Sequence, residues 1–96
     1  MAAAYVIGEI EVTDPRLYDD YRKQVLATIE KFGGRFVVRG GRLEALEGGW
    51  APKRLVVVEF PSMEKALAWY RSPEYAPLIA LRQKASRGKL LVVEGG

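Results

Sequence analysis

The sequence predicts an α+β protein with the element order β-α-β-β-α-β, an antiparallel four-stranded sheet and helices on one face of that sheet. Two observations carry this prediction. Four short segments either alternate apolar and polar residues or consist mainly of β-branched residues, and glycine or proline separates them. The longer segments between them repeat apolar residues every three or four positions, which is the period of a helix that buries one side.

The first strand is expected over residues 4–12, where successive side chains alternate between two faces. Asp14 and Pro15 then mark a helix start, because a carboxylate can accept the free backbone N–H groups and proline suits the first helical position. This helix has a single apolar stripe, formed by Tyr18, Tyr21, Val25, Ile29 and Phe32. Gly33 and Gly34 end it, since glycine tolerates the left-handed conformation found after helices.

A short second strand is expected over residues 35–39, before Gly40 and Gly41. Residues 42–46 fit either a ragged strand extension or an arm, and residues 47–53 form a loop that contains Trp50. The third strand, residues 54–60, is an almost continuous β-branched run, which indicates burial on both faces.

Pro61 and Ser62 close the third strand and start a helix that continues through Tyr70. The sequence Ser-Pro-Glu at residues 72–74 breaks it, and a second helical segment runs to about Arg87. Residues 89–94 form the last strand. In a ferredoxin-like arrangement of this order, the first and third strands lie at the centre of the sheet, and residues 1–96 form one domain.

Composition excludes several classes of function. The 15 basic residues are dispersed among 12 acidic ones, which argues against nucleic-acid binding. With no histidine and no cysteine, the usual catalytic triads cannot form, and zinc and haem sites lose their commonest ligands. Neither a metal nor a cofactor is therefore expected. No apolar run is long enough to span a membrane and no signal peptide is recognisable, so a cytoplasmic location is expected.

The second face of the sheet carries apolar residues in the first, third and last strands. Because an exposed apolar sheet favours association, we expect a homodimer through these faces, forming an α/β barrel. Glu9 and Glu59 fall on this face, and strand alternation places Arg39 with Arg35 and Val37 beside them. This charged cluster is either a salt bridge at the dimer contact or a polar patch in a ligand cavity.

The chain resembles a family of small bacterial proteins named domain of unknown function 1330 (DUF1330), within the dimeric α/β-barrel superfamily. The segments that carry the resemblance are YVIGEIEVTDP, FGGRFVVRGG, VVVEFPS, WYRSPEY and LLVVEG. The resemblance implies a ferredoxin-like homodimer and no particular reaction. The superfamily includes quinol-forming and haem-degrading monooxygenases, muconolactone-isomerase-like proteins and dye peroxidases, but a shared fold does not transfer their activities.

A cofactor-free pocket between helices and sheet remains the best candidate site. Its expected ligand-binding residues are Tyr18, Arg39, Trp50, Glu59, Tyr70 and Tyr75. Glu59 and Arg39 are the catalytic candidates, as a base and as a group that orients an anion or a carbonyl. Helical aromatic residues, including Tyr21 and Trp69, also fit simple core packing, and Trp50 fits either a dimer clasp or a pocket lid.

Three functions follow as alternatives. The first is a homodimer that binds a small hydrophobic or aromatic molecule. The second is a cofactor-independent monooxygenase or isomerase that uses Glu59, Arg39 and a tyrosine. The third is a structural or regulatory dimer with a filled core.

Overall fold

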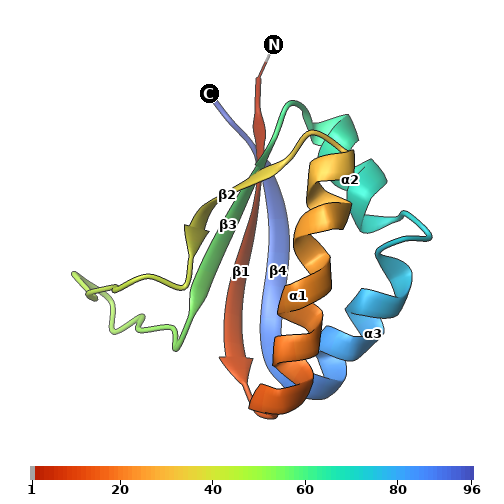
Figure 1. Cartoon of the computed structure of the whole chain (residues 1–96). Coiled ribbons are helices and arrows are strands. Elements are labelled where there is room, and N and C mark those ends of the chain that lie inside the picture. Colours follow the sequence, from red (N-terminus) through yellow and green to blue (C-terminus); the bar gives the residue numbers. More distant parts are fainter. Residues whose placement is uncertain (1) are drawn as a thin grey trace.

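The computed structural model describes residues 2–96. Strands and helices follow the order β1 (Ala4–Val12), α1 (Pro15–Lys31), β2 (Arg35–Arg39), β3 (Leu55–Phe60), α2 (Met63–Tyr70), α3 (Ala76–Ala85) and β4 (Ser86–Glu94). The sheet order is β2-β3-β1-β4 and every neighbouring pair is antiparallel. The predicted ferredoxin-like fold, with the first and third strands at the centre, is confirmed (Figure 1).

The ends of α1 form as the sequence predicts. The Asp14 side chain accepts a hydrogen bond from the backbone N–H of Leu17 at 3.2 Å, and Pro15 is the first helical residue. At the other end Gly33 has a φ of +80°, and its N–H donates to the carbonyl of Glu30. Glycine is favoured there because a side chain strains this left-handed conformation.

The junction between α3 and β4 differs from the expectation. The last strand begins at Ser86, three residues before the predicted Lys89, and α3 stops at Ala85. The reason lies in β1, whose residues pair with β4 as far as Val12, opposite Ser86. The backbone N–H groups of Thr13 and Asp14 then both donate to the carbonyl of Ala85. A long partner strand therefore extends β4 at the expense of the helix.

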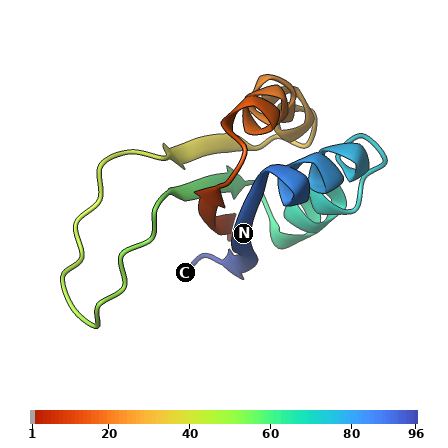
Figure 2. The same cartoon turned by 90° about the horizontal axis from the view of Figure 1, so that it is seen from below.

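The core lies between the sheet and the three helices, which all cover the same face (Figure 2). The largest side chains that are completely buried there are Trp69, Tyr75, Phe60, Ile10, Ile29 and Val25. From β1 the core receives alternate residues, beginning with Ala4 and Val6. The intervening residues, such as Tyr5 and Ile7, face the other side, which we call the open face.

The open face is apolar over much of its area. Leu91 and Val93 of β4 are 58% and 45% exposed, and Val37 of β2 is 43% exposed. Ile7 and Val57 lie opposite one another on the central strands and are half-buried. No helix among residues 2–96 covers the open face (Figure 2).

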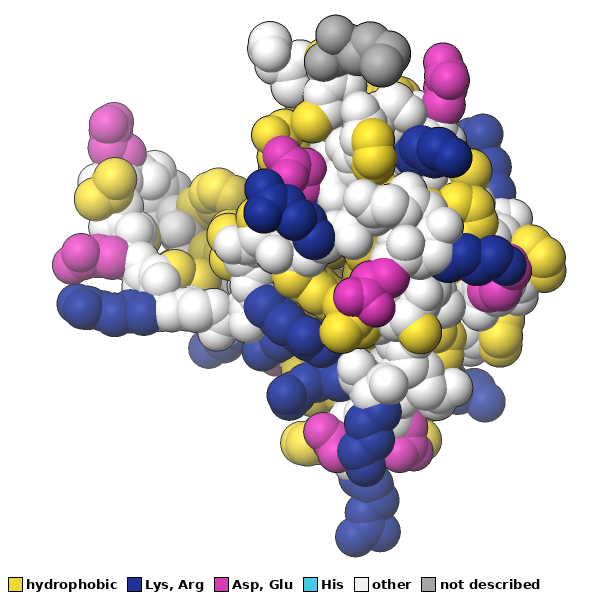
Figure 3. Space-filling model, turned by 45° about the horizontal axis from the view of Figure 1, so that its top comes forward, with side chains coloured by type: hydrophobic (Ala, Val, Ile, Leu, Met, Phe, Trp, Pro, Cys, Tyr) yellow, Lys and Arg dark blue, Asp and Glu magenta, His cyan; other side chains and the backbone are white. Residues whose placement is uncertain are grey.

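Residues 40–54 form an irregular arm between β2 and β3, which settles the alternatives for residues 42–46. The arm extends away from the helical layer and stands out from the body of the molecule (Figures 2 and 3). Leu46 and Trp50 on this arm are 89% and 60% exposed. On the face shown in Figure 3, basic side chains are scattered among acidic and apolar ones. None of the helices within residues 2–96 is long and apolar enough to cross a membrane.

Candidate functional site

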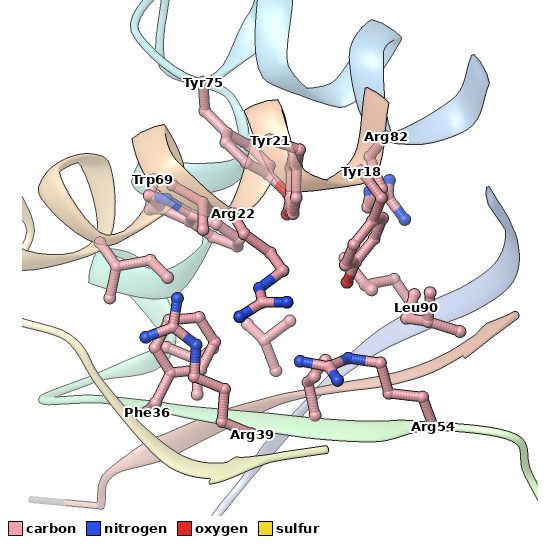
Figure 4. Close-up of a pocket in the computed structure, with 16 residues that line it drawn as sticks. Tyr18, Tyr21, Arg22, Phe36, Arg39, Arg54, Trp69, Tyr75, Arg82 and Leu90 are labelled. Carbon is pink, nitrogen blue, oxygen red and sulfur yellow. The ribbon is translucent and has the colours of Figure 1, made fainter. Parts of the chain in front are cut away.

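A small hollow, partly open to solvent, lies between the helices and the sheet. Its apolar lining includes Val25 and Ile29 of α1 and Val58 of β3, and it also contains tyrosine and arginine side chains (Figure 4). The hollow is narrow, with room for only a few water molecules in this conformation.

An aromatic cluster forms the inner wall of the hollow. The rings of Trp69 and Tyr75 stack with their centroids 4.1 Å apart, and the hydroxyl groups of Tyr21 and Tyr75 are 2.7 Å apart. The Trp69 indole N–H donates to Thr28 Oγ1 at 3.0 Å. Every polar atom named here therefore has a partner, as buried polar groups require. The wall therefore contains two hydroxyl groups that hydrogen-bond to each other.

Both tyrosines of this pair are held in the neutral form. Burial is the main cause that raises the pKa of Tyr21 and of Tyr75 above the ordinary value for tyrosine. The positive charge of Arg82 acts in the opposite direction on both groups but does not outweigh the loss of hydration. Neither hydroxyl is suited to act as a base near neutral pH.

Arg39 lies on the helix-facing side of the sheet, which contradicts its predicted position beside Arg35 and Val37. The register between β2 and β3 shifts between Phe36 and Val38, so Val37 is an extra residue in β2. Such a bulge reverses the alternation of side chains beyond it. Arg39 consequently lies over the ring of Phe36, at 4.3 Å from its centroid, and lines the hollow.

Glu59 lies on the open face, with Arg35 instead of Arg39. Its carboxylate accepts hydrogen bonds from Arg35 Nε at 2.8 Å and from the Tyr5 hydroxyl at 3.0 Å. Both bonds lower the pKa of Glu59 below its ordinary value, and the bond from Arg35 has the larger effect. The two catalytic candidates are thus on opposite faces of the sheet, and the predicted cluster of Glu9, Arg39 and Glu59 is wrong.

The remaining predicted residues are divided between the hollow and other surfaces. Tyr18 and Tyr75 line the hollow together with Arg39. Trp50 does not line it: its indole N–H donates to the carboxylate of Glu9 at 2.9 Å, so Trp50 is no lid of the hollow in this chain. Tyr70 is 37% exposed and borders a separate groove between α2 and β4.

The hollow is also lined by three arginines that the sequence did not lead us to predict as site residues: Arg22, Arg54 and Arg82. One signal was present in the sequence. Arg82 occupies the buried stripe of α3 beside Leu78 and Ala85, and a charged residue in such a stripe needs a specific reason. Arg22 and Arg54 have no comparable local signal. Within residues 2–96, no group of three or more acidic side chains is placed to hold a metal ion.

Comparison with solved structures gives the same fold class. A protein of unknown function from Rhodopseudomonas palustris is 18% identical, with a TM-score of 0.76 over 96% of this chain and 81% of the other. SnoaB, a cofactor-independent oxygenase from Streptomyces nogalater, is 11% identical, with a TM-score of 0.66 over 97% and 92% of the two chains. A dimeric ferredoxin-like protein of unknown function from Thermobifida fusca is 16% identical, with a TM-score of 0.51 over 97% and 89%.

At these identities the similarity establishes a shared ferredoxin-like fold and does not extend to activity. No curated protein matches the sequence. The family described as domain of unknown function (DUF1330) matches residues 3–96, and the chain belongs to that family. The resemblance seen in the sequence is therefore confirmed.

Proposed function

We propose that this protein binds a small, mainly apolar molecule in the hollow between the helices and the sheet. The observation that carries the proposal is the hollow itself, a concave and mainly apolar space that opens partly to solvent, as ligand pockets do. Its wall combines apolar side chains with the Tyr21 and Tyr75 hydroxyl groups, a common composition for such pockets. A ligand larger than a few waters requires the exposed side chain of Arg22 to move.

A thermal-shift experiment with two naphthalene derivatives, 1-naphthamide and 1-naphthoate, tests this function. A ligand that binds only the folded protein raises its melting temperature. We expect at least one of the two compounds to do so, and Val56→Phe to abolish the shift because Val56 lines the hollow. Leu26→Phe adds a similar ring on the outer surface of α1 and serves as the matched control. Absence of any shift with both compounds would refute the proposal.

The second part of the proposal is a homodimer that pairs the open faces of two copies. A second copy fits because it would cover the exposed Leu91 and Val93, and an apolar sheet is rarely left in water. Each Glu59 carboxylate already has its partners in its own chain, so pairing leaves no unmatched charge at that position. In the proposed dimer, the exposed Leu46 and Trp50 of the arm would contact the partner. The Thermobifida fusca protein is also described as dimeric, which supports a dimer.

Sedimentation at micromolar concentration tests the dimer. Wild-type protein is expected to sediment as a dimer, and Leu91→Lys as a monomer, because a charge buried within an apolar contact has no partner. Leu26→Lys, on the outer surface of α1, is the control and stays dimeric. A monomeric wild-type protein would leave the open face uncovered and refute this arrangement.

A cofactor-independent oxygenase is the second candidate, favoured by the structural similarity to SnoaB. The hollow contains no carboxylate among its lining residues, and its paired tyrosines stay neutral. Any reaction there would begin from a substrate acidic enough to bind already deprotonated. This candidate requires that the protein consume oxygen with such a substrate. The rate should be unchanged in Glu59→Gln and lost in Arg39→Gln.

A further inference from the structure

Four arginines from four different segments line the hollow. Arg22 comes from α1, Arg39 from the end of β2, Arg54 from the residue before β3, and Arg82 from α3. In Figure 4 the guanidinium group of Arg22 lies between those of Arg39 and Arg54, and Tyr18 and Tyr21 lie on the helical side of them. None of the lining residues is Asp or Glu.

These charges have little compensation within the chain. In the part that the structure describes, no ion pair includes Arg39, Arg54 or Arg82, and Arg22 approaches Asp19 only at 4.0 Å on the surface. Arg82 is 7% exposed, and its Nε has no hydrogen-bond partner among residues 2–96. The Nε of Arg54 is buried and unpartnered in the same way. Burying cationic groups without an anion is costly, and proteins usually provide a partner.

The surroundings of two of these arginines hold their guanidinium groups toward the hollow. Arg39 lies over the ring of Phe36, and Arg54 lies 5.9 Å from the centroid of the Tyr18 ring. Arg54 also packs against Gly40, where any side chain would overlap its guanidinium. A planar guanidinium that is held in place can bind a carboxylate through two parallel hydrogen bonds.

We propose that the ligand of the hollow is an apolar carboxylate, such as an aromatic monocarboxylic acid, whose carboxylate lies among Arg22, Arg39 and Arg54. Its apolar part packs against the aromatic wall and the valines of the interior. This inference rests on the proposed function, since it names the class of molecule that occupies the same hollow. The ligand thus supplies the negative charge that the chain itself does not place there.

The affinities of 1-naphthoate and 1-naphthamide, measured by isothermal titration calorimetry, test the inference. The two compounds share a ring system and nearly the same shape and differ in charge. We expect 1-naphthoate to bind about tenfold or more tightly than the amide, because hydrogen bonds between charged groups are roughly twice as strong as neutral ones. Equal affinities would overturn the carboxylate assignment and leave the binding function standing. Absence of binding by both would overturn the binding function as well.

Arginine variants separate a ligand-binding role from a structural one. Arg39→Gln and Arg54→Gln are each expected to weaken 1-naphthoate binding about tenfold and to leave 1-naphthamide binding unchanged. Arg42→Gln, on the arm, removes the same charge outside the hollow and is expected to have no effect. In the absence of ligand, Arg39→Gln is expected to melt at the same or a higher temperature, because it relieves repulsion. A lowered melting temperature with unchanged 1-naphthoate affinity would show a structural role and refute the inference, as would equal weakening by Arg42→Gln.

Discussion

The paired hydroxyl groups of Tyr21 and Tyr75 allow a quantitative test of how the wall of the hollow is held together. They are 2.7 Å apart, in side chains that are 8% and 0% exposed respectively. Tyr21→Phe removes one partner and leaves the hydroxyl of the fully buried Tyr75 without the other. An unsatisfied buried hydroxyl costs about 1–3 kcal/mol, so we expect a loss of about 2 kcal/mol in the free energy of unfolding.

Tyr75→Phe is expected to cost less, about 1 kcal/mol, because Tyr21 is 8% exposed whereas Tyr75 is fully buried, so water can replace the partner of the remaining Tyr21 hydroxyl more easily. The double variant removes both hydroxyl groups and leaves neither unsatisfied, so its cost is expected to be about 1 kcal/mol. The summed loss in the free energy of unfolding of the two single variants then exceeds the loss in the double variant by about 2 kcal/mol, which is the coupling energy of the pair. For a domain of this length, Tyr21→Phe lowers the melting temperature by roughly 8–16 °C.

Urea unfolding followed by circular dichroism measures these free energies, at one fixed protomer concentration because a dimer would make stability depend on it. Tyr70→Phe is the control, since Tyr70 is 37% exposed and its loss is expected to change stability by less than about 0.5 kcal/mol. The hydroxyl groups would not depend on each other if each single variant changed the free energy of unfolding by less than about 0.5 kcal/mol. The same would follow if the loss in the double variant equalled the sum of the losses in the two single variants.

Three further predictions concern pH and the approach of β2 to Arg54. The folded pKa of Glu59 is lowered, so its contribution to stability is present above the unfolded pKa and is lost as the pH falls through the folded pKa. Urea unfolding in increasingly acidic buffers should therefore show a smaller acid-side loss for Glu59→Gln than for wild type, and identical profiles would contradict the Arg35 and Tyr5 contacts. The folded pKa values of Tyr21 and Tyr75 are raised, so their contribution is complete below the unfolded value of 10.0 and is lost as the pH rises beyond it. Alkaline thermal unfolding should affect the double phenylalanine variant less than wild type, and an equal effect would argue against burial as the cause. Gly40→Ala should cost about 1–2 kcal/mol, because φ is +71° there and the added methyl group displaces the Arg54 guanidinium. Gly41→Ala is the control, because a methyl group added there meets no atom within 4 Å. If Gly40→Ala and Gly41→Ala changed urea unfolding and 1-naphthoate affinity equally, the packing of Arg54 on Gly40 would be contradicted.

Sequence periodicity was sufficient for most of the fold. The apolar stripe that begins at Tyr18 packs toward the sheet, and Asp14 and Ser62 cap their helices as expected. These features depend on a few neighbouring residues, whose spacing decides which side of a helix or strand is buried. The boundary of β4 was less predictable, because pairing with β1 and not local preference decides where that strand begins.

The site depended on tertiary structure. One extra residue at Val37 reverses the alternation in β2, which moves Arg39 to the helix-facing side and leaves Arg35 beside Glu59. A bulge is defined by the pairing between two strands, and the residues of one strand alone do not reveal it. Arg54 and Arg82 likewise approach one hollow only after the sheet and α3 pack together. The sequence by itself determined the elements and the apolar core, since these follow from local periodicity, whereas the grouping of the arginines was decided by contacts between segments far apart in the chain.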